Sequence, residues 1–417
     1  MPISATSAQA ATRTLSVDEA LERILARVAP LPAARVALPD ALGAVLAIEV
    51  VADRDVPPFR NSAMDGYAVR GADVVGPTAR LRVIGEIAAG QIPTGTLRAG
   101  EAMRIMTGAP MPDGSDTVVR VEDTDDGRDT VTVLKAVPLG LSVRAAGEDL
   151  RAGETVLRAG TLLRPAELGV LATLGRGVIR IVPRPRVTVL STGDELVELD
   201  AEVGPGQIRD ANRYSLAAAA RACGAVVEAP GIVRDTAEAL RAALAAAAAR
   251  SDVIVTSGGV SVGDHDHVKP VVDELGSMDF WSIAIRPGRP LAFGEIRDGQ
   301  RLVPIFGLPG NPVSSLLTFE LFVRPALLKL AGRTKLERPR ANARLTDAID
   351  TPPGLRFFAR GIHDPRAGTV RTTGPQGSGI LRSMSLANCL IDIPAETDHL
   401  GAGTTVTVIR TDELEDH

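Results

Sequence analysis

The segment from Ile254 to Pro270 combines a strand pattern, a glycine-rich loop and acidic side chains, so it could bind an anion or a metal ion. It begins in the β-branched run 252–256, which predicts a buried strand. The following glycines can adopt positive φ and let a ligand approach the backbone closely. They are Gly258, Gly259 and Gly263. Free N–H groups in such a loop can bind an anion, and Asp264 and Asp266 can bind a hard cation. The alternative is a tight turn without a ligand.

Two other predicted strands also end in polar residues. One runs into Asp194 and Glu195, and another leads to a helix start at Asn311. Because the carboxyl ends of parallel strands lie along one edge of a sheet, we expect these loops to form one crevice. Carboxylates there suit Mg²⁺ bound together with a substrate phosphate. Simple helix capping by the same residues is the alternative.

Basic and hydroxyl side chains near these loops could hold a phosphate or another oxyanion. The candidates are Lys269, Arg286, Arg289 and Ser314. The guanidinium fork of arginine matches the geometry of such anions. Ordinary surface charges are the alternative for the two arginines.

Motifs that would identify a reaction directly are weak in this sequence. No Walker A loop and no G-x-G-x-x-G fingerprint is present, which excludes the usual ATPase and dehydrogenase classes. Ser261 lies in a G-x-S-x-G match, but the downstream histidines that could serve as its base fall in a separate β-rich region or the tail. His265 and His267 alone are a poor zinc signature.

Length and composition limit the class of protein. The chain has 417 residues and a net charge of −5, so we expect about three domains and no nucleic-acid partner driven by bulk charge. Cys223 and Cys389 are too few for a disulfide framework and indicate free thiols in a reducing compartment. The first fifteen residues lack an apolar signal core, and no run of about 18 apolar residues exists. We therefore expect a cytoplasmic protein without a membrane span.

The elements that position these residues fall into several domains. A helix capped by Ser16 and another that begins at Pro165 are expected to pack together. The fold class that we predict is multidomain α/β plus β, with a three-layer α/β/α domain around a mostly parallel sheet. The predicted parts are a leader (1–14), a discontinuous helical or mixed domain (15–50 and 147–183), an inserted β-rich domain (51–146), the α/β domain (184–333), a small β-barrel or sandwich (334–412) and a tail (413–417).

Three further polar residues lie outside the α/β domain. Asp65 stands among small and polar residues before a predicted strand, and Thr107 stands in a rigid turn after another. Asp149 follows a glycine and a glutamate further along the chain. Turn stabilisation is the alternative for Asp65 and Thr107.

Six motifs, taken in this order, resemble the molybdopterin molybdenumtransferase family of the MoeA type, which is related to the C-terminal part of gephyrin. The similarity spans about residues 15 to 410. The motifs are Asn61–Ala68, Ile105–Pro110, Ser191–Leu196, Ser257–Asp264, Arg286–Pro290 and Gly307–Ser314.

The resemblance implies a homodimer of four-domain subunits around a molybdopterin-binding-like α/β domain. It implies insertion of molybdate into adenylylated molybdopterin to give molybdenum cofactor and AMP, with Mg²⁺ or another divalent cation. The site would lie between the α/β domain of one subunit and the domain with Asp65 of the other. A molybdopterin adenylyltransferase and the enzymes that accept the cofactor are the protein partners that this role suggests.

The family's functional positions, combined with the chemistry above, give a set of candidate residues. The candidate catalytic residues are Asp65, Thr107, Asp149, Glu195 and Asp266. The candidate substrate-binding residues are Asp235, Ser257, Gly258, Gly259, Ser261, Lys269, Arg286, Arg289, Pro309, Gly310, Asn311, Pro312 and Ser314. The candidate metal ligands are Asp194, Glu195 and Asp266. Asp264 stands where the family usually has Glu, and the two histidines beside it match no functional position.

Three rival classes stay open at this point. One is an adenylyltransferase or nucleotide-amidase relative that shares only the α/β domain, although the segments at 61–68 and 104–112 argue against it. Another is a non-catalytic molybdopterin-binding or scaffold protein. The last is a paralogue that selects tungstate.

Overall fold

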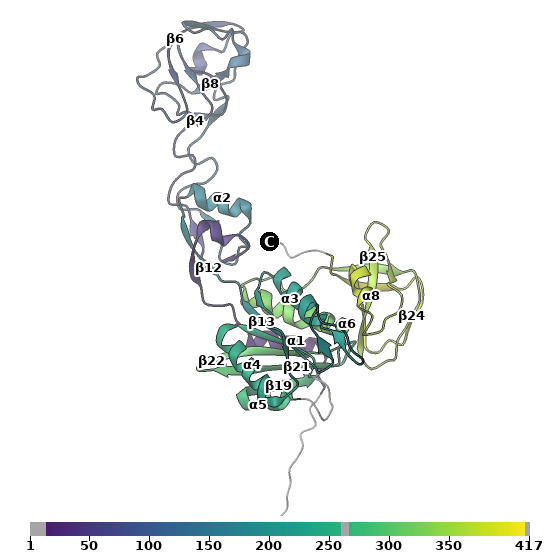
Figure 1. The fold of residues 1–417 in the computed structure, drawn as a ribbon. Coiled ribbons are helices and arrows are strands. Elements are labelled where there is room, and N and C mark those ends of the chain that lie inside the picture. Colours follow the sequence, from purple (N-terminus) through teal and green to yellow (C-terminus); the bar gives the residue numbers. More distant parts are fainter. Residues whose placement is uncertain (1–13, 260–266, 413–417) are drawn as a thin grey trace, which may run out of the picture.

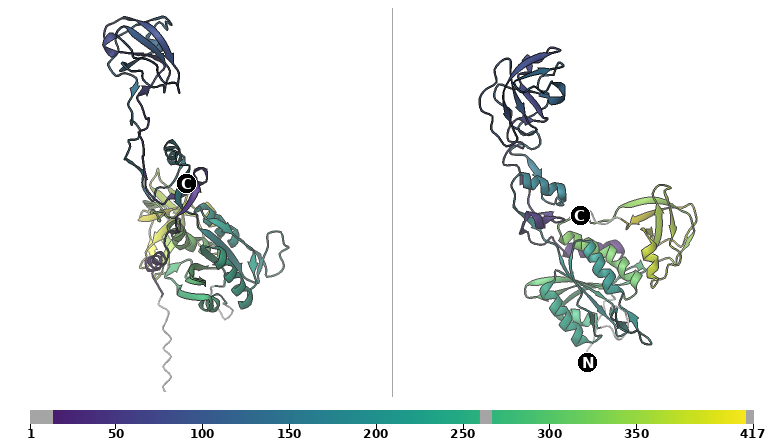
Figure 2. Two further views of the ribbon diagram at one scale, coloured as in Figure 1. Left: turned by 90° about the vertical axis from the view of Figure 1, so that its left-hand side faces the viewer. Right: turned by 45° about the horizontal axis from the view of Figure 1, so that its top comes forward.

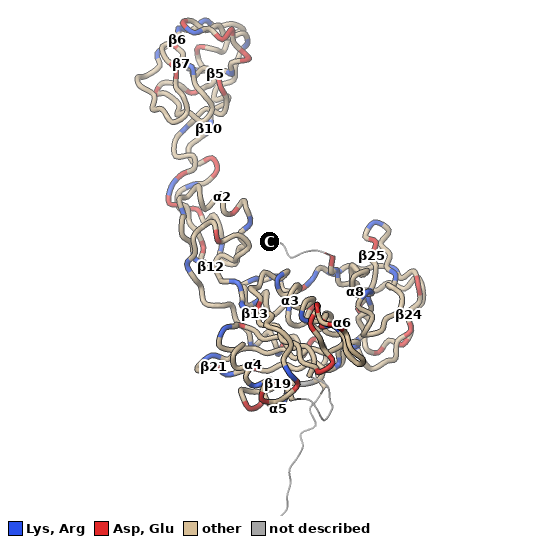
Figure 3. The backbone as a smooth tube through the Cα atoms, viewed as in Figure 1, with Lys and Arg blue, Asp and Glu red and all other residues tan. Residues whose placement is uncertain are grey.

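The computed structural model describes residues 14–259 and 267–412. The chain is elongated: a β-rich domain lies at one end, a small domain follows, and the α/β and C-terminal domains lie side by side at the other end (Figures 1 and 2). Positively and negatively charged residues are interspersed along the backbone of each domain (Figure 3). In the described part of the chain, no helix is both long enough and apolar enough to cross a bilayer.

The β-rich domain is built on a five-stranded sheet with the order β8-β5-β7-β6-β9. Tyr67, Val119 and Val131 are fully buried in its core. A short pair of strands, β4 and β10, joins the sheet to the rest of the molecule. The strands are β4 (Asn61–Ser62), β5 (Gly66–Val69), β6 (Ala79–Ile87), β7 (Glu101–Ile105), β8 (Thr117–Arg120), β9 (Thr130–Val133) and β10 (Val143–Arg144), with 3₁₀ turns η2 (Gly71–Asp73) and η3 (Val121–Asp123).

The small domain contains a three-stranded sheet covered by one helix. The sheet has the order β1-β12-β2, and β3 pairs with β11 beside it. Leu171 of the helix packs in a core with Leu46 and Ile179. The elements are β1 (Ala34–Ala37), η1 (Leu38–Ala41), β2 (Val45–Leu46), β3 (Val50–Val51), β11 (Thr155–Leu157), α2 (Pro165–Thr173) and β12 (Val178–Val182).

The packing partner expected for the first helix was wrong. Ser16 and Glu19 form the capping box at the start of α1 (Val17–Arg27), as the spacing predicts. Ala20 and Ile24 of α1, however, lie in the core of the α/β domain, where α1 contacts α7 (Arg324–Leu330), and not on α2. An apolar helix face can pack on any suitable apolar surface, so its periodicity does not specify the partner.

The α/β domain contains one mixed sheet with the order β16-β13-β18-β22-β21-β19, and β17 also pairs with β13. The strands β16, β13, β18 and β22 are parallel, while β21 runs antiparallel to both of its neighbours, β22 and β19. The carboxyl ends of β13, β18 and β22 therefore lie side by side, and Ser257 pairs with both Ser191 and Leu308. The strands are β13 (Arg186–Thr192), β16 (Val226–Glu228), β17 (Ile232–Val233), β18 (Val253–Ser257), β19 (Gly276–Ser282), β21 (Pro290–Asp298) and β22 (Arg301–Leu308).

Helices pack on this sheet through two separate cores. Val255 lies in a core with α1, α3, α6 and α7, whereas its neighbour Ile254 lies in a core with α4 and α5. Successive side chains of a strand point to opposite faces, so the apolar run fills both cores. Burial of each such side chain stabilises the folded state by about 1.5–3 kcal/mol relative to leaving it exposed. The helices are α3 (Asn212–Ala222), α4 (Ala237–Arg250), α5 (Val268–Leu275) and α6 (Pro312–Thr318), which continues through η4 (Phe319–Val323) into α7.

The C-terminal domain is a small barrel-like sheet. Its order is β20-β25-β26-β23-β29-β27, and pairing of β25 with β27 closes it. The segment that leaves the α/β sheet enters this barrel as β20, which places residue 286 where the two domains meet. The elements are β20 (Ile285–Arg286), β23 (Arg340–Leu345), β24 (Ile349–Asp350), β25 (Arg356–Asp364), β26 (Thr369–Thr372), α8 (Leu381–Leu386), β27 (Cys389–Ile393), β28 (His399–Leu400) and β29 (Thr405–Arg410).

Candidate functional site

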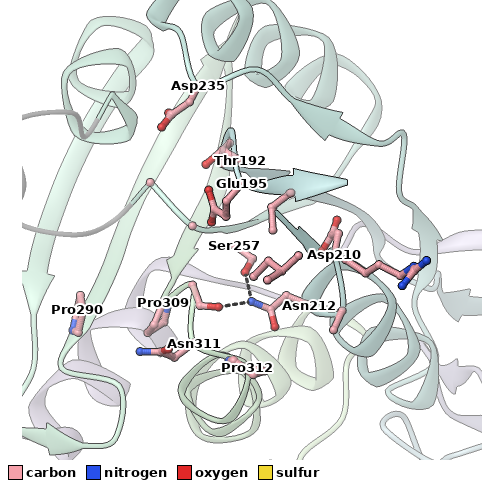
Figure 4. A pocket seen from close by; sticks show the side chains of 18 residues that line it. Thr192, Glu195, Asp210, Asn212, Asp235, Ser257, Pro290, Pro309, Asn311 and Pro312 are labelled. Carbon is pink, nitrogen blue, oxygen red and sulfur yellow. Dashed lines mark hydrogen bonds between the residues drawn. The ribbon is translucent and has the colours of Figure 1, made fainter. Parts of the chain in front are cut away.

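A cavity of about 590 Å³ lies at the carboxyl edge of the parallel strands (Figure 4). Its volume is within the range of small-molecule sites. The ends of β13, β18 and β22 contribute most of its walls, and the arm formed by β14 (Leu196–Val197) and β15 (Ile208–Arg209) contributes one side. The candidate residues that line it are Glu195, Asp235, Ser257, Gly258, Gly259, Pro309, Gly310, Asn311 and Pro312.

The carboxylates of this cavity differ from the set expected for a metal. Glu195 and Asp235 line the cavity, whereas Asp194 is exposed and does not. Asp210 also lines it, but Asp210 pairs with Arg213, with Oδ2 and Nε 3.3 Å apart. Two open carboxylates suit a hard cation shared with a phosphate. Within residues 14–259 and 267–412, no cluster of three potential metal ligands is present.

The glycines of the loop after β18 are required by packing as well as by any ligand. Gly258 and Gly259 have φ of 87° and 65°, which favours glycine. A Cβ at position 258 would lie 2.3 Å from the carbonyl oxygen of Thr192, and one at position 259 would lie 2.9 Å from its hydroxyl oxygen. The glycine pattern therefore has two causes: positive φ and close contact with the neighbouring strand end.

Asn212 is a residue of this cavity that the sequence did not reveal. Asn212 is the first residue of α3 and stands in the wall of the cavity. Its Nδ2 donates to Ser257 Oγ at 2.8 Å and to the Gly310 carbonyl oxygen at 2.7 Å (Figure 4). No spacing or motif signals such a contact, because its partners lie 45 and 98 residues away.

A second cavity of about 370 Å³ adjoins the first and shares Pro290, Pro309 and Asn311 with it. Arg286, Arg289 and Ser314 line this second cavity together with residues 376–378 of the C-terminal domain. The guanidinium of Arg286 stacks over the Phe357 ring, 5.2 Å from its centroid. Both arginines are exposed, so their guanidinium groups can reach an anion. Lys269, in contrast, is exposed on α5 and lines neither cavity.

A buried arginine supports the C-terminal wall of the second cavity. Arg360 is fully buried, and its Nη2 donates to the Gly377 carbonyl oxygen at 3.1 Å. Its Nε donates to Ser383 Oγ at 3.0 Å. Burial lowers the pKa of Arg360 to about 10, so it stays charged at neutral pH. The role of Arg360 could not be predicted from the sequence, because arginine in a strand usually faces solvent.

Asp65 and Thr107 form a separate pair in the β-rich domain. Asp65 precedes β5 and Thr107 follows its neighbour β7, so both lie at one end of the sheet. The amide and the hydroxyl of Thr107 each donate to Asp65 Oδ1 at 2.7 Å, and these hydrogen bonds hold the pKa of Asp65 below its ordinary value. Neither residue lines either cavity, and their domain lies at the far end of the chain (Figure 1).

The remaining candidates are also outside both cavities. Asp149 is exposed in the connection between the β-rich and small domains, where its amide donates to the Val56 carbonyl oxygen at 3.0 Å. His267 precedes α5 and lines neither cavity. Ser261, Asp264, His265 and Asp266 lie outside the described residues.

Together, the parallel strand ends and the two adjoining cavities define a multidomain protein built around a ligand-binding α/β domain. Three family models match the chain in order. They are the MoeA N-terminal region (domain I and II) at residues 15–175, a probable molybdopterin binding domain at 188–329 and the MoeA C-terminal region (domain IV) at 342–410.

Similar proteins agree with these models. Molybdopterin molybdenumtransferase 2 of Mycobacterium tuberculosis is 42% identical over 386 residues, which cover 89% of this chain and 94% of that protein. The molybdopterin molybdenumtransferase of Haemophilus influenzae is 36% identical and covers 94% of this chain and 98% of its own. A crystal structure of the molybdopterin biosynthesis moeA protein from Pyrococcus horikoshii matches with a TM-score of 0.79 and 28% identity, over 96% of this chain and 100% of that one.

The chain belongs to the molybdopterin molybdenumtransferase family of the MoeA type. It is an enzyme of the transferase class with a role in molybdenum cofactor biosynthesis. The resemblance seen in the six motifs is thus confirmed, as is the multidomain fold with a C-terminal barrel-like domain.

Proposed function

We propose that this enzyme inserts molybdate into adenylylated molybdopterin and releases AMP together with molybdenum cofactor. The observation that supports this most directly is the pair of adjoining cavities. One is rich in glycine and carries two open carboxylates, and the other presents two exposed arginines. A substrate with phosphates in the first cavity would place its reacting end next to an oxyanion in the second.

The larger cavity suits the pterin nucleotide. Ser257 offers a hydroxyl there, and the glycines leave the backbone accessible. Glu195 and Asp235 would hold a divalent cation, which supplies charge neutralisation at the phosphates. Asp194 is not part of this set, since it is exposed and does not line the cavity.

The smaller cavity suits molybdate. Arg286 and Arg289 carry two positive charges, which match a dianion, and the Ser314 hydroxyl can donate to it. Arg360 fixes the Gly377 segment behind the anion and adds a buried charge that no carboxylate neutralises among the residues described. We propose Arg286, Arg289 and Ser314 as the residues that bind and orient the oxyanion.

We also propose that the enzyme acts as a homodimer with a shared site. Asp65 and Thr107 lie in a domain that the small domain separates from both cavities in the same chain (Figure 1). A second copy could bring this domain over the crevice, as a twofold arrangement allows. Asp65 would then enter as an ionised carboxylate, since its hydrogen bonds from Thr107 lower its pKa. In that form it can orient the substrate or accept a proton.

The direct test is release of AMP from adenylylated molybdopterin by the purified chain. We expect release to require molybdate and a divalent cation. A parallel reaction with tungstate at matched concentration separates a tungstate-selective enzyme from a molybdate enzyme. Binding of the substrate without any oxyanion-dependent release would instead support a non-catalytic binding protein.

A further inference from the structure

We propose that Asn212 is a positioning residue that sets the hydrogen-bond polarity of the floor of the larger cavity. This inference rests on the proposed function, because it concerns how the phosphate-bearing substrate is bound there. Asn212 links three segments that are far apart in the sequence. They are its own helix α3, the end of β18 and the turn before α6.

The geometry uses the amide group of Asn212 only as a donor to these two partners. Nδ2 carries two hydrogens, which serve its two contacts: the nitrogen lies 2.8 Å from Ser257 Oγ and 2.7 Å from the Gly310 carbonyl oxygen. Asn212 is 9% exposed and Ser257 is 2% exposed. Water therefore competes little with these contacts, and a lost partner would be costly.

The first contact determines what the Ser257 hydroxyl can do. A serine hydroxyl has one hydrogen to donate and can accept on its lone pairs. Because the amide nitrogen Nδ2 of Asn212 can only donate, Ser257 Oγ must accept in this hydrogen bond. The hydroxyl hydrogen of Ser257 is therefore left available. No acceptor for that hydrogen is present in residues 14–259 and 267–412, and Ser257 lines the cavity. Ser257 is therefore held as a donor for an anionic ligand.

The second contact covers the carbonyl oxygen of Gly310, which would otherwise repel an anionic ligand. The carbonyl oxygen of Gly310 carries partial negative charge, and Gly310 lines the same cavity. The hydrogen bond from Asn212 neutralises part of this charge and fixes the orientation of the turn that also carries Pro309 and Asn311. Both contacts thus shift the floor of the cavity towards donors, which is the polarity that a phosphate requires.

Asn212→Asp tests this idea, since it keeps the shape and replaces the donor with an acceptor. In the assay of AMP release, we expect KM for adenylylated molybdopterin to rise by about tenfold or more near pH 8, with kcat changed by less than about threefold. Lowering the pH should restore part of the affinity, because a protonated aspartate can donate again and burial raises its pKa. A purely structural defect would not follow this pH profile.

Asn388→Asp is the matched control. Asn388 makes two side-chain hydrogen bonds with the backbone of His363, at 2.7 and 2.9 Å, and lines neither cavity. We expect it to lower the thermal unfolding midpoint without changing KM. Ser257→Ala provides a second variant should Asn212→Asp fail to fold, and it should also raise KM.

The outcomes separate the inference from the proposed function. A wild-type chain that releases no AMP with molybdate contradicts the proposed function. A wild-type chain that works, combined with unchanged KM in folded Asn212→Asp or in Ser257→Ala, overturns the role of Asn212. The same holds if the KM increase in Asn212→Asp does not depend on pH or if Asn388→Asp reproduces it.

Discussion

Thr107 donates two hydrogen bonds to a single oxygen of Asp65, one from its amide and one from its hydroxyl, each 2.7 Å long. The second carboxylate oxygen stays available, because no described residue donates a hydrogen bond to it. Since both donors stabilise the ionised form, they hold the pKa of Asp65 below its ordinary value. The pair therefore presents an anion with a fixed orientation.

Thr107→Val should shift the acidic limb of the pH profile of kcat/KM to higher pH. The valine keeps the backbone donor and removes the hydroxyl donor, so the pKa of Asp65 rises towards its ordinary value. The native pair contributes stability that is full above the unfolded pKa of Asp65 and is lost as the pH falls through the lowered, folded pKa. Thr107→Ser, which keeps both donors, should leave the limb in place, and a shift of equal size in both variants would contradict this role.

Mixed dimers can reveal whether the site is shared. Asp65→Asn and Glu195→Gln chains should each be nearly inactive alone. Co-expressed in equal amounts, they should recover about a quarter of wild-type AMP release, because half of the dimers are mixed and each mixed dimer holds one intact site. If Asp65 and Glu195 acted within one chain, no mixed dimer would hold an intact site and no activity would return.

The sequence predicts the strands and the position of the crevice better than the polar contacts between side chains. The apolar runs of β13, β18 and β22 mark buried parallel strands, and the position of the crevice follows from parallel topology. The partner of α1 could not be predicted, since its apolar face fits several surfaces. The contacts of Asn212 could not be predicted either, because they depend on three segments that meet only in the folded chain.

Neighbouring carboxylates show the same limit. Asp194 and Glu195 are equivalent by sequence pattern, yet only Glu195 lines the cavity. The local conformation of the loop decides between them, and Gly193, with φ of 148°, is part of that loop. Asp235, assigned to substrate binding by its resemblance to a family position, lies across the same cavity.

Arg289→Gln should weaken binding of molybdate selectively. The side chain is exposed in the smaller cavity and makes no ion pair with any described residue, so its charge is free to bind the dianion. We expect KM for molybdate to rise by about tenfold, with KM for the pterin nucleotide little changed. Lys269→Gln, which removes the same charge outside both cavities, is the control. Equal effects of the two variants would indicate a general electrostatic attraction instead of direct binding.

Gly258→Ala should destabilise the α/β domain and impair substrate binding. The added Cβ would lie 2.3 Å from the Thr192 carbonyl oxygen, and φ is 87° at this position. Strain and displacement together should cost about 2–4 kcal/mol, visible as a lower thermal unfolding midpoint. Gly90→Ala shares the positive φ, at 83°, but meets no atom within 4 Å, so its cost should be about 1–2 kcal/mol. Equal losses would show that backbone strain alone, without close contact to β13, explains the glycine.

Substitution of Glu195 or Asp235 should change the dependence of activity on a divalent cation, whereas substitution of Asp194 should not. Chelation should stop AMP release and added Mg²⁺ should restore it, since the phosphates and two carboxylates otherwise repel each other in one cavity. Glu195→Gln and Asp235→Asn should each lower the maximal activity, and the activity that remains should need about tenfold more Mg²⁺ to reach half its maximum, because each change removes one charged oxygen ligand. Asp194→Asn should change it little, because that carboxylate lies outside the cavity lining. An Asp194→Asn variant with the larger shift would mean that the loop after β13 rearranges to exchange the two neighbouring carboxylates when substrate binds.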